Sequence, residues 1–133
     1  MACLREARPR FQEQVDEYLI RHRSILDILS KLQESTARVS RAISKAVTAC
    51  GCVTVKAGKQ QFPNDLSLAE VRPYMDTHLS GALCERCREA VETEIGSVLF
   101  YTAALCSVTN LDLEAVQKKE HSRVNSLGIF TLK

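Results

Sequence analysis

Four cysteines of the chain occur as two close pairs, and their spacing indicates a metal site. One pair lies in the sequence CGC at 50–52 and the other in CERC at 84–87. Four thiolates form the tetrahedral ligand set that structural Zn²⁺ takes in proteins. Gly51 lacks a side chain, so a turn there can bring two sulfurs one residue apart to the same ion. The predicted structural zinc ligands are Cys50, Cys52, Cys84 and Cys87.

The spacing of the cysteines leaves other interpretations open. An iron–sulfur cluster uses the same ligand type, and the four residues could also be thiols with no joint role or contain a disulfide or redox pair. His78 could replace one cysteine as a ligand, although a single histidine in a loop is usually solvated. Cys106 lies in an apolar stretch and is expected to pack as a small apolar residue, and Cys3 is assigned no role.

Two long helices are expected to position the cysteine pairs. Apolar residues recur at three- and four-residue steps in the stretch 83–106, which predicts one long helix with Cys84 and Cys87 in its first turn. Negative charge is favoured at that end, so a thiolate forms there more easily. Ser24 is a suitable cap for an earlier helix of about 25 residues that ends near Gly51. The expected inner stripes are Ile25, Ile28, Leu29, Leu32, Val39, Ile43 and Ala46 on the earlier helix, and Ile95, Val98, Leu99, Ala103 and Cys106 on the later one.

The remaining segments are shorter. The stretch from about 51 to 81 loses the helical period and is expected to be an irregular connector, with a short extended piece at 53–55 and a capping box at Ser67. A last helix is expected from about Leu113 to Arg123, followed by Gly128 and an extended tail. A first helix is expected after Pro9, with Phe11, Val15, Tyr18 and Leu19 on its inner side.

Composition bounds the domain count and the classes of partner. The chain has 133 residues, 45% of them hydrophobic, which predicts a single domain over 1–133. Its net charge is +2 and aromatic residues make up 5%, so nucleic acid is not an expected partner. No continuous apolar run approaches the roughly 20 residues that cross a bilayer, and the start lacks the apolar core of a secretory signal. We therefore expect a cytoplasmic protein that is not in a membrane.

Two stretches resemble the motif helices of MazG-type all-α nucleotide pyrophosphohydrolases. They run from Leu32-Gln33-Glu34 through Val39 to Ala42-Ile43, and over EIGSVLFY at 94–101, and NLDLE at 110–114 resembles the start of that family's last helix. The resemblance implies an all-α antiparallel bundle, a homodimer or tetramer, and a nucleotide ligand. In the family, one helix carries E-E-x-x-E and the next E-x-x-D, and these carboxylates hold magnesium ions that bind the triphosphate and activate water.

Several of the motif carboxylates are replaced in this chain. The first motif corresponds to Glu34, Ser35 and Arg38, and the second to Glu94 and Ser97. Magnesium requires hard oxygen ligands, and the arginine adds a competing cation. Glu34 and Arg38 also belong to a charged face of the earlier helix with opposite charges four residues apart, a pattern typical of a solvated surface. The members of this face are Asp27, Lys31, Glu34, Arg38, Arg41 and Lys45.

These observations predict an all-α, MazG-like antiparallel helical bundle whose connector is clamped by a four-cysteine site. The expected function is that of a non-catalytic protein with structural zinc that acts by binding a nucleotide or a protein partner. The alternative is a magnesium-dependent nucleoside triphosphate pyrophosphohydrolase. In that case Glu34 and Glu94 would hold magnesium together with carboxylates outside the motif, such as Asp65 or Asp76.

Overall fold

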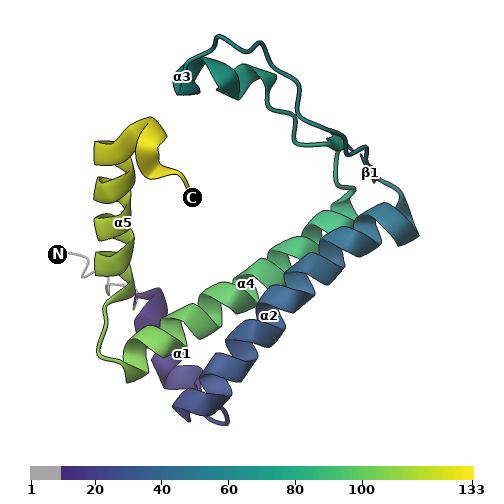
Figure 1. The fold of residues 1–133 in the computed structure, drawn as a ribbon. Helices are drawn as coiled ribbons and strands as arrows, with labels where there is room; N and C mark the ends of the chain where they lie inside the picture. Colours follow the sequence, from purple (N-terminus) through teal and green to yellow (C-terminus); the bar gives the residue numbers. More distant parts are fainter. Residues whose placement is uncertain (1–9) are drawn as a thin grey trace, which may run out of the picture.

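The computed structural model describes residues 10–133, and its centre is a pair of long antiparallel helices (Figure 1). These are α2, Ile25–Lys45, and α4, Glu85–Val108. Ser24 caps α2 as predicted, because its hydroxyl accepts a hydrogen bond from the backbone N–H of Leu26 at 3.3 Å. Cys3 and Pro9 lie outside the described residues.

The end of α2 widens into a π-helical turn, η1, at Ala46–Cys50. Gly51 follows with a φ of 78°, and its N–H donates to the carbonyl of Ala46 at 2.9 Å. This left-handed conformation strains residues that carry a Cβ atom, which explains the glycine at this position. The predicted helix end near Cys50 and Gly51 is confirmed.

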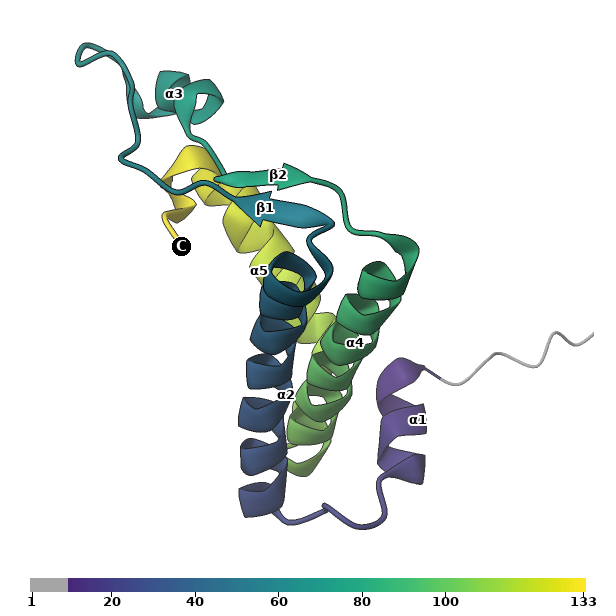
Figure 2. The same cartoon turned by 90° about the vertical axis from the view of Figure 1, so that its right-hand side faces the viewer.

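The connector between α2 and α4 contains a small antiparallel sheet, which Figure 2 shows beyond the end of the helix pair. β1, Val53–Val55, was predicted, whereas β2, Leu79–Gly81, was not. Val53 lies opposite Gly81, and a Cβ atom on Gly81 would lie 2.7 Å from the carbonyl oxygen of Cys52. The remainder of the connector includes α3, Leu68–Val71, with the predicted capping box, and a 3₁₀ turn, η2, at Arg72–Tyr74.

The hydrophobic core lies toward the other end of the helix pair. There α1, Phe11–Tyr18, packs against α4. The buried cluster consists of Val15, Leu19, Ile28, Ala103 and Ala104. Two residues of α1 that were predicted to face inward, Phe11 and Tyr18, are exposed at 47% and 69%. A helix of only eight residues presents a single narrow face to α4, and Val15 occupies it.

The predicted inner stripes of α2 and α4 are only partly buried. Ile28 of α2 and Ala46, the first residue of η1, are fully buried, whereas Ile25 and Leu29 of α2 are exposed. On α4, the exposed residues include Ile95 and Leu99, which were also predicted to face inward. The buried residues of the two helices are often small, and the larger apolar side chains therefore lie on other sides of α2 and α4.

The last helix does not complete the bundle, which corrects a prediction. α5 spans Leu113–Leu127, one turn beyond the predicted end, and none of its residues is buried. It turns away from α4 just after the turn that joins the two helices (Figure 1). The predicted extended tail is instead a 3₁₀ turn, η3, at Gly128–Thr131.

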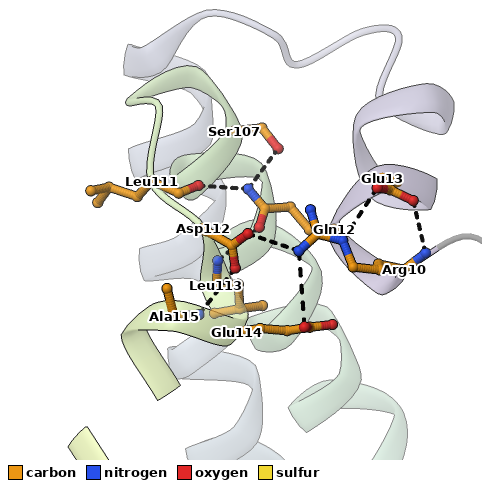
Figure 3. A network of polar contacts seen from close by, with 9 residues as sticks. All are labelled: Arg10, Gln12, Glu13, Ser107, Leu111, Asp112, Leu113, Glu114 and Ala115. Atoms are coloured by element: carbon orange, nitrogen blue, oxygen red, sulfur yellow. Dashed lines mark hydrogen bonds and ion pairs between the residues drawn. The ribbon is translucent and has the colours of Figure 1, made fainter. Parts of the chain in front are cut away.

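Side-chain hydrogen bonds hold the junction of α1, α4 and α5 (Figure 3). The amide of Gln12 donates to the carbonyl of Leu111 at 2.8 Å and accepts from the N–H of Leu113 at 2.7 Å. The guanidinium of Arg10 lies 2.7 Å from the carboxylate of Asp112, which also caps α5. Arg10 and this cap hold the pKa of Asp112 below its usual range.

The helix α4 is long and apolar enough, by length and composition alone, to cross a membrane. This differs from the expectation that no segment reaches that length. The core helix of a soluble protein, when mostly buried, passes the same test, and α4 packs against both α2 and α1 with 22% of its apolar window buried. The observation is therefore weak evidence for a membrane segment.

Candidate metal centre

The four predicted ligands come together where the helix pair meets the connector. Cys50 ends the π-helical turn, Cys52 precedes β1, Cys84 is the N-cap of α4 and Cys87 lies in the first turn of α4. Their sulfur atoms all lie within 4.8 Å of one another. This is the only such group of histidine, cysteine and acidic side chains in residues 10–133. The structure thus joins residues that are 34 positions apart in the sequence.

The sulfur spacing fits a tetrahedral ion. Zn–S bonds of about 2.3 Å separate the sulfurs of a tetrahedron by about 3.8 Å. The sulfurs of Cys50 and Cys84 lie 3.8 Å apart, and the other pairs would need to contract by at most about 1 Å to reach the same spacing. Side chains that lie this close can adjust to an ion without a change in the fold.

The two sulfurs of the α4 end differ in proton affinity. The Cys84 sulfur accepts a hydrogen bond from the backbone N–H of Cys87 at 3.4 Å, and this bond lowers the pKa of Cys84 to about 7. The hydrogen bond to Cys84 raises the pKa of Cys87 to about 12, because it favours the protonated thiol. A bound divalent ion would reverse the second effect, since a coordinating thiol is deprotonated.

A site with four cysteine ligands is closed. Zinc in structural sites takes four protein ligands, whereas a catalytic zinc keeps one position for water or substrate. Cys50, Cys52, Cys84 and Cys87 would fill all four positions. The ion would then join the end of α2, the start of β1 and the start of α4, which is a structural role.

The other candidate residues of this region lie outside the cluster. His78 belongs to the connector, where its backbone N–H donates to the carboxylate of Asp76, and it is not part of the sulfur group. Cys106 is buried as predicted, and burial raises its pKa. Cys50 is exposed and its three partners are half-buried, so an ion could reach the sulfurs from solvent.

The positions of the MazG-like motifs lie along the helix pair. Glu34, Ser35, Arg38 and Ser97 line one small cavity of about 160 Å³ together with Lys31 and Tyr101. The carboxylate of Glu34 lies 2.8 Å from Arg38 and 3.1 Å from Lys31. Both cations, Lys31 first, lower the pKa of Glu34. The carboxylate therefore already has two positive partners.

Ser35 is a buried position, which sequence reasoning did not predict. It is 4% exposed, and its hydroxyl donates to the carbonyl of Lys31 at 2.8 Å. A small residue suits the close approach of α2 and α4 here. A glutamate at this position would bury a carboxylate against the neighbouring helix, which is costly unless it is paired.

The remaining carboxylates that were considered as magnesium ligands do not gather near Glu34. Glu94 lines the adjoining groove, which shares Arg38 with the Glu34 cavity, and Asp76 lines a pocket within the connector. Among the described residues, no three acidic groups come together as the four cysteines do.

Sequence reasoning missed a cationic groove beside the cysteines. It lies between α2 and α4, has a volume of about 650 Å³, and is lined by Arg38, Arg41, Lys45, Arg86 and Glu94, four alanines, Cys50 and Cys87. The three α2 cations follow one another at steps of three and four residues, a spacing that was interpreted as a solvated face. The position of Arg86 opposite them depends on how the two helices pack.

Comparisons with protein families, curated proteins and solved structures give no match to this chain. The structure itself defines the coarser class, a mostly helical protein with a small two-stranded sheet and a cluster of four cysteines that could hold a metal ion. The MazG-like assignment rests on the sequence motifs alone and stays a prediction.

Proposed function

We propose that the protein is a non-catalytic, MazG-like helical protein that holds one structural zinc ion and acts by binding. The observation that carries this proposal is the cluster of four sulfurs within 4.8 Å of one another. Zinc is preferred over an iron–sulfur cluster because a single tetrahedral ion suits four sulfurs at this spacing, and it is the usual occupant of a four-cysteine site between secondary-structure elements.

The structural role of the ion follows from what it would connect. Between residues 51 and 83, Val53 is the only buried hydrophobic residue. A connector with so little buried apolar surface gains little stability from the hydrophobic effect. A metal bound by Cys50, Cys52, Cys84 and Cys87 would supply that stability from both ends of the connector.

The charges around Glu34 support the non-catalytic part of the proposal. Pyrophosphohydrolysis through magnesium needs several carboxylates that are free to coordinate the ion. Glu34 is engaged by Arg38 and Lys31, and Ser35 and Ser97 carry no charge. The site is therefore cationic before a phosphate arrives.

The alternative function remains magnesium-dependent pyrophosphohydrolysis. One observation favours it: Glu34 and Ser97, which come from the two motif helices, line the same cavity, as the resemblance requires. Glu94 lies one turn before Ser97 on α4. A bound nucleotide could bring its own magnesium to these two glutamates.

Two measurements on the purified full-length chain test the proposal. Elemental analysis should find about one zinc per chain, because four thiolates satisfy one ion. A panel of nucleoside triphosphates with magnesium should release no pyrophosphate above the rate without protein. A protein without zinc would overturn the structural-metal proposal, and sustained magnesium-dependent pyrophosphate release would favour the alternative.

We also propose that the chain is a cytoplasmic homo-oligomer in which a second copy covers α5. A helix of 15 residues without buried side chains is marginal in water. Its apolar residues Val116, Val124 and Leu127 are exposed, as are Ile95 and Leu99 of α4. A symmetric contact would bury both sets at once. Light scattering at micromolar concentration should give a dimer or tetramer, and a strictly monomeric mass would contradict this part.

A further inference from the structure

The groove between α2 and α4 combines a cavity of small-molecule size with a strong positive charge. Its volume of about 650 Å³ falls within the range of roughly 300 to 1,000 Å³ that is usual for ligand pockets. Four cationic side chains and one carboxylate line it, which leaves a net charge of three positive. The whole chain carries only +2, so this charge is a local concentration and not a general property of the surface.

Most of these cations are available to a ligand. Arg38 is paired with Glu34, but Arg41, Lys45 and Arg86 form no ion pair within residues 10–133. Glu94, the one acidic residue of the groove, also has no cationic partner within 4.0 Å in this part of the chain. Like charges gathered from two helices repel one another, and a bound anion would remove that repulsion.

The shape of the groove adds a second requirement on the ligand. Its wall includes the small residues Ala42, Ala49 and Ala90, which are at least partly exposed, with the fully buried Ala46 behind them. Small side chains leave room for a ligand body beside the charged group, and their methyl groups offer it an apolar surface. A ligand with a compact anionic part and an uncharged body fits this arrangement.

Phosphoryl groups match the cations better than a single carboxylate does. Arginine presents a planar fork of N–H donors that binds phosphate oxygens in pairs, and two arginines and a lysine without partners offer several such bonds. One carboxylate would neutralise only one of the three net charges. Two linked phosphoryl groups carry about three negative charges near neutral pH, because the second ionisation of a terminal phosphate lies close to 6.

We propose that this groove binds a small phosphorylated molecule with two or more phosphoryl charges, without a magnesium ion. Arg41, Lys45 and Arg86 bind the phosphoryl oxygens, and the alanine wall accommodates the rest of the ligand. This inference rests on the proposed binding function and names its site and ligand class. It differs from the magnesium alternative because positive side chains, and not a metal held by carboxylates, neutralise the phosphates.

The cysteine cluster lies at the end of the groove and positions part of it. Cys50 and Cys87 line the groove themselves, and Arg86 lies between Cys84 and Cys87 in the turn that the metal would fix. Loss of the metal would release this turn, and Arg86 would then face Arg41 less often. The structural ion and the anion site are therefore coupled through the position of one arginine.

Isothermal titration calorimetry with sodium pyrophosphate tests the proposal on the zinc-loaded full chain, without added divalent ions. Wild-type protein should bind pyrophosphate, and both Arg41→Gln and Arg86→Gln should weaken binding roughly tenfold, as expected for the loss of charge-assisted hydrogen bonds. The matched control is Arg88→Gln, which removes the same charge from an exposed position of α4 outside the groove. Arg88→Gln should change the affinity for pyrophosphate less than about twofold, because Arg88 does not line the groove. Exposed charges farther apart than about 8 Å are largely screened from each other at physiological salt.

Three outcomes overturn the inference. The first is that folded, zinc-loaded wild type does not bind pyrophosphate. The second is that Arg88→Gln weakens pyrophosphate binding as much as Arg41→Gln and Arg86→Gln do. The third is that a single-stranded oligonucleotide binds more tightly than pyrophosphate and that all three variants weaken its binding alike. Zinc content and hydrolysis are measured separately from binding. A protein that holds zinc and does not hydrolyse nucleotides, but has no affinity for pyrophosphate, would reject the phosphate-binding groove and leave the structural-zinc proposal intact. Magnesium-dependent turnover would reject the non-catalytic function, while the three variants would still report whether the groove binds phosphates.

Discussion

The two ends of the α2–α4 pair differ in the groups that meet there. At one end amide, guanidinium and carboxylate groups form hydrogen bonds, and at the other end four sulfurs lie close together. Near α1, the Gln12 side chain satisfies backbone groups on both sides of the turn between α4 and α5. Near the connector, no comparable set of hydrogen bonds joins α2 to α4 in the described residues, and the four cysteines occupy the junction. The first junction is formed by the polypeptide alone, whereas the second brings together four cysteines that could hold a metal ion.

The difference follows from how much apolar surface each end buries. Val15, Leu19, Ile28, Ala103 and Ala104 form a core next to the hydrogen-bonded junction. The connector has Val53 as its only buried hydrophobic residue. Small units without a core commonly depend on disulfides or metals. One end of this chain has a hydrophobic core, and the other has a cysteine cluster that could hold a metal ion. Predictions that remove each support should therefore affect different ends of the molecule.

The largest expected effect is that of the metal ligands. Cys84→Ser, Cys52→Ser or a chelator should remove zinc and lower the unfolding temperature by roughly 10 °C or more, because the binding free energy of the ion contributes to folding. Hydrogen exchange should show lost protection in β1, β2 and the first turn of α4, with protection kept near Ile28.

The matched control for the cysteine variants is Cys3→Ser, which removes a thiol that is assigned no role in the sequence. It should retain about one zinc per chain and the wild-type unfolding temperature, as four ligands remain. If Cys84→Ser melted like the wild type in a metal-free state, the cysteine end would not depend on an ion.

The second effect concerns the apolar end. Ile28 is fully buried in the core cluster, and Ile28→Ala should cost roughly 2–5 kcal/mol of unfolding free energy, through lost burial and the cavity left behind. Zinc content should stay at one per chain, because Ile28 lies near the start of α2 and the cysteines lie beyond its end. Urea unfolding together with metal analysis checks both statements. Zinc loss in this variant would show that the two ends are not independent.

The comparison also explains which features could be predicted from the sequence. The cysteine pairs and Gly51 carry local signals, since ligand type, short spacing and turn geometry are visible in a few residues. The capped start of α2 at Ser24 and its end at Gly51 have equally local causes. The helix bounds agree with the structure because neighbouring residues determine them, whereas the two cysteine pairs meet across 34 positions only through the antiparallel packing of the helices.

Features that depend on packing were not predictable in the same way. A stripe of apolar residues locates a helix, but the buried sides of α2 and α4 carry small residues such as Ser35 and Ala104, while Ile95 and Leu99 of α4 remain exposed. The direction of α5 and the pairing of β2 depend on contacts between distant segments. The cationic groove needs Arg86 opposite Arg41, and only the antiparallel packing of the two helices creates that arrangement.

A smaller effect is expected at the hydrogen-bonded junction. Gln12→Ala would leave the N–H of Leu113 and the carbonyl of Leu111 without their partner, at a cost of about 1–2 kcal/mol. Gln14→Ala, on the exposed side of the same helix, should stay within about 0.5 kcal/mol of the wild type. Urea unfolding measures both. Equal stability of the two variants would mean that solvent replaces the Gln12 contacts at little cost.

The smallest expected effect is a pH dependence at the same junction. Asp112 accepts hydrogen bonds from Arg10 and from the N–H of Ala115, and both hold its pKa below the usual range. A carboxyl with a lowered folded pKa contributes stability above its unfolded pKa of about 3.9, and this contribution is lost as the pH falls through the folded value. Asp112→Asn keeps a helix cap but loses the charge that Arg10 contacts. The unfolding temperature of the wild type should exceed that of Asp112→Asn at neutral pH, and the difference should vanish only below about pH 4. Acid release of a bound metal ion would occur in both proteins and so would cancel in the difference. A difference that disappeared near pH 6 would contradict the assignment of the effect to the Asp112 carboxylate, whose pKa lies below its usual range.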